Sequence, residues 1–147
     1  MKNQKHLEKA DIIGYKYIAK FVAKECHREG AKRILLLGTK RLMNNGVIDV
    51  YLKKQGIEVM NTTNYPEEVL EIDNIIDNIR QNIISFDDKE YLMNFIYQFP
   101  CDCQVEPPDA VVLGAPELSE LIYEEDVEVP LISANQAHID KIICQYS

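Results

Sequence analysis

The chain has 147 residues, of which 46% are hydrophobic and 27% are charged. A chain of this length suits one domain that buries its core without help from a metal or a disulfide. Its 16 Lys and Arg against 24 Asp and Glu give a formal net charge of −8, which argues against nucleic acids and anionic membrane surfaces as partners. No apolar run approaches the roughly 20 residues of a membrane helix. The first residues lack an apolar export segment, so we expect a cytoplasmic protein with reduced cysteines.

Helical and extended patterns alternate along the chain. Apolar residues at helical spacing predict a helix over 7–29, and two short apolar runs closed by glycine, 33–38 and 109–114, predict strands buried on both faces. The same signals predict further strands over 57–61 and 129–133, and further helices over 43–55, 66–84, 87–99, 117–123 and 135–146. Pro66 suits a first helical turn, and Asp87 is a candidate N-cap for the helix that follows it.

This order of elements predicts βαβ units, and therefore a parallel sheet with helices on both faces. We expect one three-layer α/β/α domain over residues 1–147, with about four parallel strands. Residues 1–30 then form an N-terminal helix, and residues 31–147 form the βα units. Ligands of such sheets bind outside the carboxyl ends of the strands. The segments to search for function are therefore 38–43, 61–65, 114–118 and 133–138.

Two of these strand ends, LLGT at 36–39 and VLGAPEL at 112–118, resemble the aspartate/glutamate racemase family. The spacing to VPLIS at 129–133 and to His138 also fits, because family members close with a similar strand and a histidine shortly after it. The resemblance covers most of this chain but only the second half of a family member. It implies a flavodoxin-like half-domain with strand order 2-1-3-4. It also implies a cofactor-free reaction in which two thiols act on opposite faces of the substrate α-carbon.

The sequence departs from the family pattern at the residues that carry this chemistry. Ala115 occupies the position of the catalytic cysteine, Pro116 that of the following threonine, and Ser133 that of the closing aspartate. Glu117 and His138 match the pattern. A methyl group transfers no proton, and proline lacks the backbone N–H that a carboxylate would bind. We therefore do not expect two-base racemisation within one chain.

The remaining candidate residues each have a functional and a structural interpretation. Glu117 and His138 are the candidate catalytic residues; alternatively, Glu117 starts a short helix and His138 is exposed in the first turn of the last helix. The candidate ligand-binding residues follow three strands, and an anionic ligand would suit the first of these loops. They are Gly38, Thr39, Lys40, Gly114, Ala115, Pro116 and Ser133. Thr39 is also an ordinary helix cap, and Leu42 and Met43 stand where the family carries a further hydroxyl.

The four cysteines do not predict a metal site or a redox site. Cys101 and Cys103 form a C-x-C pair without a second pair nearby, whereas zinc needs four well-placed ligands. Cys26 and Cys144 fall on apolar helix faces and are interpreted as core thiols. The acidic run 124–128 is interpreted as a solvated loop, with too few ordered oxygens for calcium. We expect neither a metal nor a cofactor.

Three functional hypotheses follow. The first is a degenerate racemase-like domain that binds a small carboxylate or amino acid, or that acts through self-association. A homodimer or a partner chain would then cover the face that the first half covers in the family. The second is an isomerase, an amino-acid racemase or related proton-abstracting enzyme, whose cleft is completed by a second chain. The third is a protein-binding regulatory module.

Overall fold

The computed structural model describes the backbone of residues 2–60, 62 and 64–133, with side chains from residue 14 onward. The closing helix predicted over 135–146 lies outside the described residues, together with His138 and Cys144. Among the described helices, none is both long enough and apolar enough to cross a membrane.

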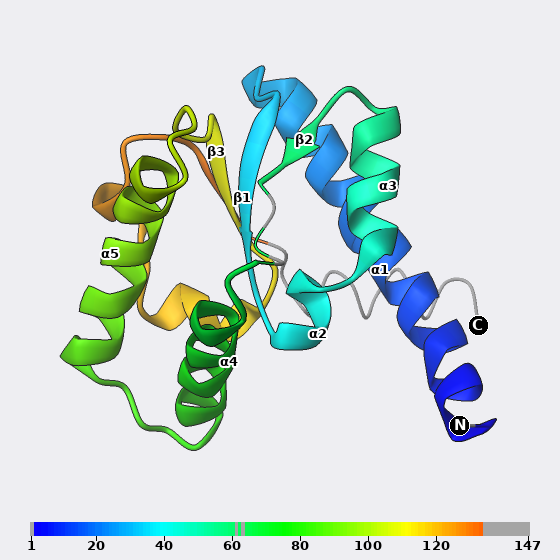
Figure 1. Cartoon of the computed structure of the whole chain (residues 1–147), viewed down its shortest axis with the longest axis horizontal. Helices are drawn as coiled ribbons and strands as arrows, with labels where there is room; N and C mark the ends of the chain where they lie inside the picture. The colour runs from blue at the N-terminus through cyan, green and yellow to red at the C-terminus, as the bar shows by residue number, and fades with distance from the viewer. Residues whose placement is uncertain (1, 61, 63, 134–147) are drawn as a thin grey trace.

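Four parallel strands form a single sheet in the order β2-β1-β3-β4 (Figure 1). The two central strands are β1 (Arg33–Leu37) and β3 (Ala110–Leu113), and all of their residues except Arg33 are buried. The two edge strands are short, β2 over Glu58–Val59 and β4 over Leu131–Ser133. This sheet confirms the predicted α/β fold and its strand order.

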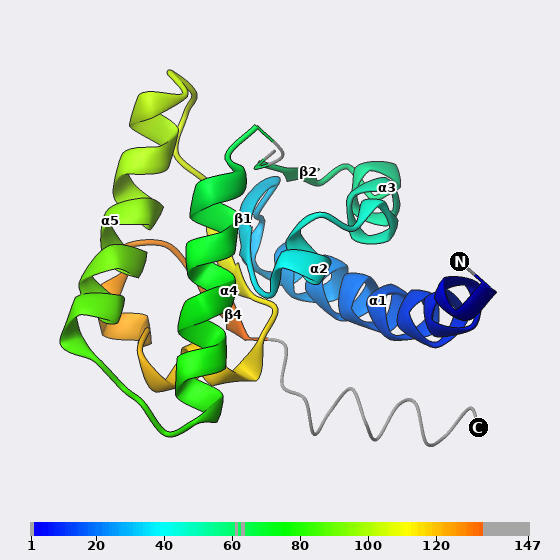
Figure 2. The ribbon, with the colours of Figure 1, turned by 60° about the horizontal axis from the view of Figure 1, so that its bottom comes forward.

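Helices cover both faces of the sheet, as predicted for right-handed crossovers (Figures 1 and 2). One face carries α1 (Lys2–Glu29) and α3 (Gly46–Lys54), and the other carries α4 (Pro66–Arg80) and α5 (Phe86–Asp102). The carboxyl-terminal half of α1 packs against both the sheet and α3. The amino-terminal end of α1 projects beyond the rest of the domain in Figure 2.

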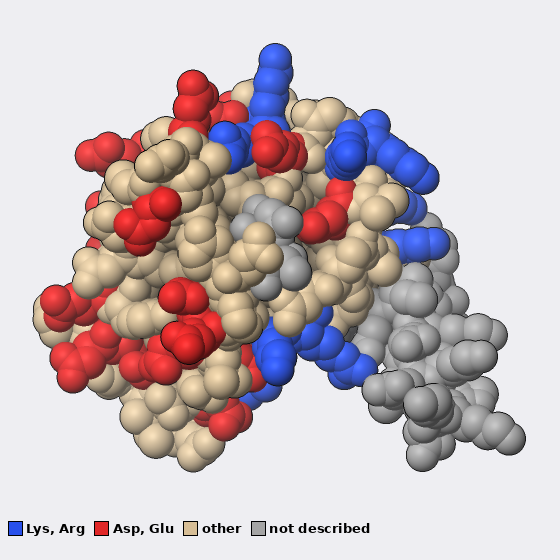
Figure 3. Space-filling view, in the orientation of Figure 1, with Lys and Arg blue, Asp and Glu red and all other residues tan. Residues whose placement is uncertain are grey.

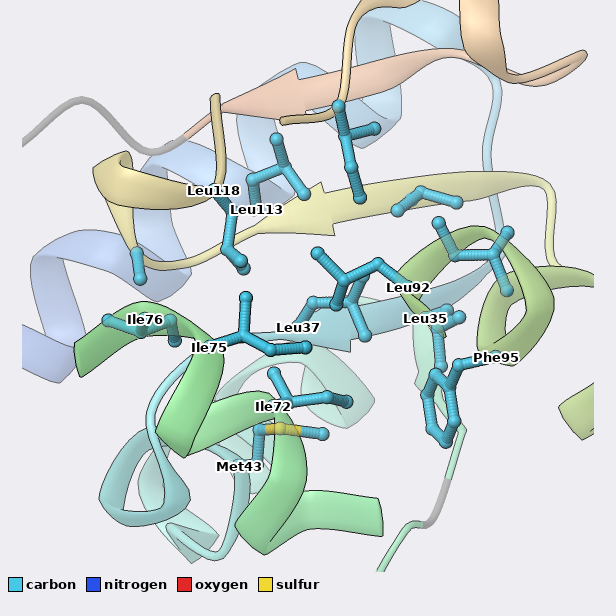
Figure 4. Packing of buried hydrophobic residues seen from close by; sticks show 14 of the residues in the cluster. Leu35, Leu37, Met43, Ile72, Ile75, Ile76, Leu92, Phe95, Leu113 and Leu118 are labelled. Atoms are coloured by element: carbon cyan, nitrogen blue, oxygen red, sulfur yellow. The ribbon is translucent and has the colours of Figure 1, made fainter. Parts of the chain in front are cut away.

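The sheet separates two hydrophobic cores. Because successive strand residues point to opposite faces, Ile34 and Leu36 face α1 and α3, whereas Leu35 and Leu37 face α4 and α5. Figure 4 shows the second core, which α4 and α5 complete with Ile72, Ile75, Ile76, Leu92 and Phe95. Burial of these side chains on both faces is the main force that holds the three layers together.

The helix predicted over 43–55 is wrong in its first part, because two helices occupy this region. α2 (Lys40–Met43) starts after Gly38 and Thr39, which follow β1, and α3 begins at Gly46. The break lies at Asn45, whose Oδ1 accepts a hydrogen bond from the Val47 amide at 2.7 Å and so caps a new helix.

The ends of α4 and α5 also differ from the prediction. α4 ends at Arg80 rather than near residue 84, and Asn82 takes a positive φ of 64° in the turn that follows. Ser85, not Asp87, caps α5, since its Oγ accepts from the Asp87 amide at 3.1 Å. α5 continues through Pro100 to Asp102.

Two short 3-10 helices replace the elements predicted between the last two strands. The helix predicted over 117–123 is η1 (Pro116–Glu120), and η2 (Glu124–Asp126) lies in the acidic run predicted as a loop. Lys89 pairs with Asp126 at 3.0 Å and ties this segment to α5.

Candidate functional site

The predicted ligand-binding residues gather at one edge of the sheet. Residues 38–40 follow β1 and residues 114–116 follow its neighbour β3, with Leu37 and Leu113 in register. The Gly114 amide donates to the Leu37 carbonyl at 2.7 Å, which holds the two loops against each other. Ser133 ends β4 in register with Leu113, so all seven residues lie at the carboxyl ends of three adjacent strands.

The side chain of Leu42 fills the space between the first two strand ends. A Cβ added to Gly38 or to Gly114 would overlap Leu42 Cδ2, and Leu42 itself is only 4% exposed. Both glycines therefore stand where the apolar side chain of α2 needs room. The Leu42 side chain thus fills the space between Gly38 and Gly114. It is a hydrocarbon group and offers a ligand neither a charge nor a hydrogen bond.

The polar groups of the first loop are used within the chain. Thr39 Oγ1 accepts from the Leu42 amide at 3.2 Å, so the structure shows the cap that was one of its two interpretations. The Lys40 amide donates to Asp73 Oδ1 of α4 at 2.8 Å. A carboxylate of the chain itself thus takes the position in which an anionic ligand would meet this amide. Sequence reasoning missed Asp73, because its partner lies 33 residues away.

Glu117 is tied to α4 by an ion pair. Arg80 Nε donates to Glu117 Oε2 at 3.0 Å, and the Glu117 side chain is only 18% exposed. Glu117 also lies in the first turn of η1, as its structural interpretation predicted. This carboxylate is therefore held by a residue of the neighbouring helix α4. His138, the other candidate catalytic residue, lies outside the described residues.

Ser133, the last residue of β4, adds a hydroxyl group at the third strand end. Ser133 Oγ lies 3.1 Å from Ser119 Oγ of η1, which joins the end of β4 to the segment after β3. Ala115 is buried and precedes η1, and Pro116 is the first residue of that helix. The segment after β3 thus places a buried methyl group, followed by a proline ring, at this strand end.

None of the three described cysteines follows a strand. Cys26 is buried between α1 and the sheet, where burial, aided by the charge of Glu25, raises the pKa of its thiol to about 11. Cys101 and Cys103 lie at the end of α5, and Cys103 Sγ donates to the Tyr65 hydroxyl at 3.0 Å. Within the described part of the chain no three His, Cys, Asp or Glu side chains come together to hold a metal ion.

The architecture is a four-stranded parallel sheet between helices, with its loops at the carboxyl ends of β1, β3 and β4, and it resembles one half of solved racemase structures. Three solved structures share it. A provisionally assigned Asp/Glu racemase from Yersinia pestis superposes with a TM-score of 0.71 and 23% identity, over 87% of this chain and 54% of that protein. An aspartate racemase homologue from Pyrococcus horikoshii OT3 gives 0.69 and 28%, over 87% and 54%.

The aspartate racemase of Picrophilus torridus gives a TM-score of 0.61 and 19% identity, over 91% of this chain and 51% of that protein. This chain therefore spans about half the length of each of these three proteins. No family model and no curated protein sequence matches it. The similarity is one of fold, and the roles of individual residues rest on the geometry of the strand ends.

Proposed function

We propose that this chain is a racemase-like half-domain that performs no two-base racemisation and acts through association with a second copy of itself. The absence of racemisation is inferred from the packing at the carboxyl ends of β1 and β3. Leu42 occupies the space between Gly38 and Gly114, and the buried Ala115 stands where the racemase pattern that the sequence resembles has its catalytic cysteine. General acid or base groups contribute about 10²–10⁴-fold each, so the loss of one abolishes useful turnover.

The internal contacts of the loops favour association over the binding of a small carboxylate. The Thr39 hydroxyl, the Lys40 amide and the Glu117 carboxylate all have partners within the chain, at 3.2, 2.8 and 3.0 Å. A carboxylate ligand would have to displace Asp73 from the Lys40 amide. Such an exchange replaces one charged hydrogen bond by another, so it leaves little net free energy for binding.

A surface suited to association lies in the turn between α4 and α5. Ile83, Ile84 and Phe86 are 49%, 57% and 76% exposed, and we call these three residues the apolar tip. The apolar tip begins three residues after Arg80, which contacts η1 at the strand ends. In Figure 1 this turn lies on the same side of the molecule as α2. Adjoining exposed apolar residues are typical of an interaction site.

A second copy is the occupant that this surface fits best. In a two-fold dimer the same patch meets itself, so an apolar patch is complementary to its own copy. Contact between two apolar tips buries Phe86 and Ile84 of both chains and brings a second protein surface to the strand-end side.

Two measurements test the proposal. Sedimentation velocity over a wide range of concentration is expected to show a dimer of the 17.0 kDa chain. The Ile84→Ser/Phe86→Ser variant is expected to be monomeric and equally stable, because both side chains are exposed. A variant at another exposed apolar residue, Val50→Ser on α3, is the matched control and should still form the dimer. A wild-type chain that stays monomeric at high concentration would refute the association.

Chiral chromatography tests the absence of racemisation. After incubation with L-aspartate or L-glutamate at high protein concentration, no D-enantiomer is expected above the level of a buffer blank. The appearance of D-aspartate in proportion to the protein concentration would refute this part of the proposal. The two parts fail independently, because a dimer can be inactive and a monomer can be active.

A further inference from the structure

A cavity of about 230 Å³ lies between α4 and α5, and none of the seven predicted ligand-binding residues lines it. Its walls combine aromatic rings with carboxylates, and the six residues on which the argument rests are Tyr65, Tyr91, Phe95, Phe99, Glu68 and Asp102. The cavity is smaller than the roughly 300–1,000 Å³ of drug-sized ligand pockets. It therefore suits a head group on a short stem.

The helix periodicity of α5 builds the aromatic wall. Tyr91, Phe95 and Phe99 are spaced by four residues and so lie along one side of the helix. Phe95 and Phe99 stack with ring centroids 4.9 Å apart, and Tyr65 meets Phe99 edge to face, also at 4.9 Å. Tyr65 is fixed further by the hydrogen bond that it receives from Cys103. The rings are thus held in place before any ligand arrives.

The electrostatic environment of this wall is negative. α4 and α5 carry nine acidic residues against Arg80 and Lys89, and Figure 3 shows Asp and Glu gathered on this side of the molecule. Burial raises the pKa of Tyr91, and the charges of Glu68, Glu71 and Glu67 raise it further.

Both carboxylates of the cavity lack a cationic partner in the described part of the chain. Asp102 accepts from the neutral amide of Gln98 at 3.0 Å, and Glu68 has no hydrogen bond or ion pair there. No Lys or Arg is among the described residues that line the cavity. Two unneutralised carboxylates beside four aromatic rings form an environment that a cation would stabilise.

We propose that this cavity binds an organic cation, an ammonium or guanidinium head group on an aliphatic stem. Cations are attracted to the faces of aromatic rings by about 0.5–2 kcal/mol, and nearby carboxylates add a charge-assisted hydrogen bond. The rings favour a weakly hydrated organic cation over an inorganic ion, which would need several oxygen ligands. This site shares no residue with the seven predicted ligand-binding residues at the ends of β1, β3 and β4 or with the apolar tip, so it stands independently of the proposed function.

The test is an NMR titration of the aromatic rings with n-butylguanidinium, with n-butylurea as its neutral analogue of the same shape. At physiological ionic strength we expect saturable shifts of the Tyr65 and Tyr91 rings, with a dissociation constant on the order of 1 mM. n-Butylurea should bind at least about tenfold more weakly, because it lacks the charge. Equal binding of the neutral analogue, or shifts that never saturate, would overturn the proposal.

Three variants assign the binding to this cavity. Glu68→Gln removes a charge at constant shape, and Tyr91→Leu removes a ring; each should weaken n-butylguanidinium binding about 2- to 30-fold. Glu120→Gln removes an exposed charge on η1 outside the cavity and should leave the affinity unchanged. Thermal unfolding checks that each variant is folded. Wild-type affinity in Glu68→Gln, or in a folded Tyr91→Leu, would refute the site.

A blocked Gly-Arg-Gly peptide distinguishes the source of the cation. If the peptide binds more tightly than n-butylguanidinium, the site takes an arginine side chain of a protein. If it binds more weakly while the small cation saturates, the site takes a free amine or guanidine. If neither probe binds, the proposal is wrong.

Discussion

Leu42 determines what the carboxyl ends of β1 and β3 can hold. Because its Cδ2 lies where a Cβ on Gly38 would be, Gly38→Ala should lower the free energy of unfolding by about 1–3 kcal/mol. In a Leu42→Ala background the same change should cost less, since the space is then empty. Urea unfolding of the four proteins of this cycle measures the coupling, expected at about 0.5–3 kcal/mol.

Gly46→Ala is the control for this cycle, because a Cβ at Gly46 meets nothing within 4 Å. Its effect on stability should be the same with and without Leu42→Ala. A cost of Gly38→Ala that is equal in both backgrounds would show that Leu42 does not fill the strand-end space.

Cys26 makes a second prediction at the scale of one side chain. Burial raises the pKa of its thiol from 9.0 to about 11, so the unfolded chain loses this proton first as the pH rises. The stabilising effect is complete below pH 9 and is lost as the pH rises through 11. Urea unfolding should therefore show a steeper decline of stability between pH 9 and pH 11 in the wild type than in Cys26→Ala. The difference is at most about 2.7 kcal/mol, and equal declines would contradict the burial of the thiol.

Among the elements, α4 braces the strand-end loops. It packs against α2 and η1, with Asp73 accepting from the Lys40 amide and Arg80 donating to Glu117. Asp73→Ala should lower the free energy of unfolding by about 1.5–3 kcal/mol, because the Lys40 amide then loses a charged partner. Asp77→Ala, on the same helix, removes an acceptor of the Gln81 side-chain amide and should lower the free energy of unfolding by only about 0.2–0.5 kcal/mol. Equal losses in chemical denaturation would show that α4 does not brace the loop.

Local patterns predicted most of the elements and little of the contacts between them. The apolar runs at Arg33–Leu37 and Ala110–Leu113 predicted the central strands, because a strand buried on both faces leaves a continuous apolar sequence. The break before α3 was missed although Asn45 and Gly46 are turn residues. Asp73 could not have been found at all, since its hydrogen bond joins residues 33 positions apart and leaves no periodic signal.

For the whole molecule, charge is divided along the chain. Residues 1–60 hold 13 Lys and Arg and six Asp and Glu, whereas residues 61–147 hold three and 18. Figure 3 shows the consequence, with acidic side chains over α4 and α5 and basic ones over α1 to α3. The composition gives only the net charge of −8, because it does not show where along the chain the charges lie. The fold places the basic first part and the acidic second part of the chain on different sides of the molecule.

This division sets the salt dependence of the proposed dimer. The apolar tip belongs to the acidic part of the chain, so contact between two tips brings like charges together. Added salt screens that repulsion, and the dimer should dissociate less at 0.5 M than at about 0.05 M salt in sedimentation equilibrium. A dimer that weakens with salt would instead indicate contact between an acidic and a basic face, and would rule out the apolar tip as the interface.

The most direct test of the central claim is proton NMR in D₂O with D- and L-aspartate and D- and L-glutamate. A working base at the strand ends exchanges the α-proton for deuterium even when the configuration is kept. The filled edge around Leu42 and the methyl group of Ala115 predict that the α-proton signals stay unchanged over long incubation with concentrated protein. A protein-dependent loss of an α-proton signal from either enantiomer would show that a base acts in this domain, and would contradict the account.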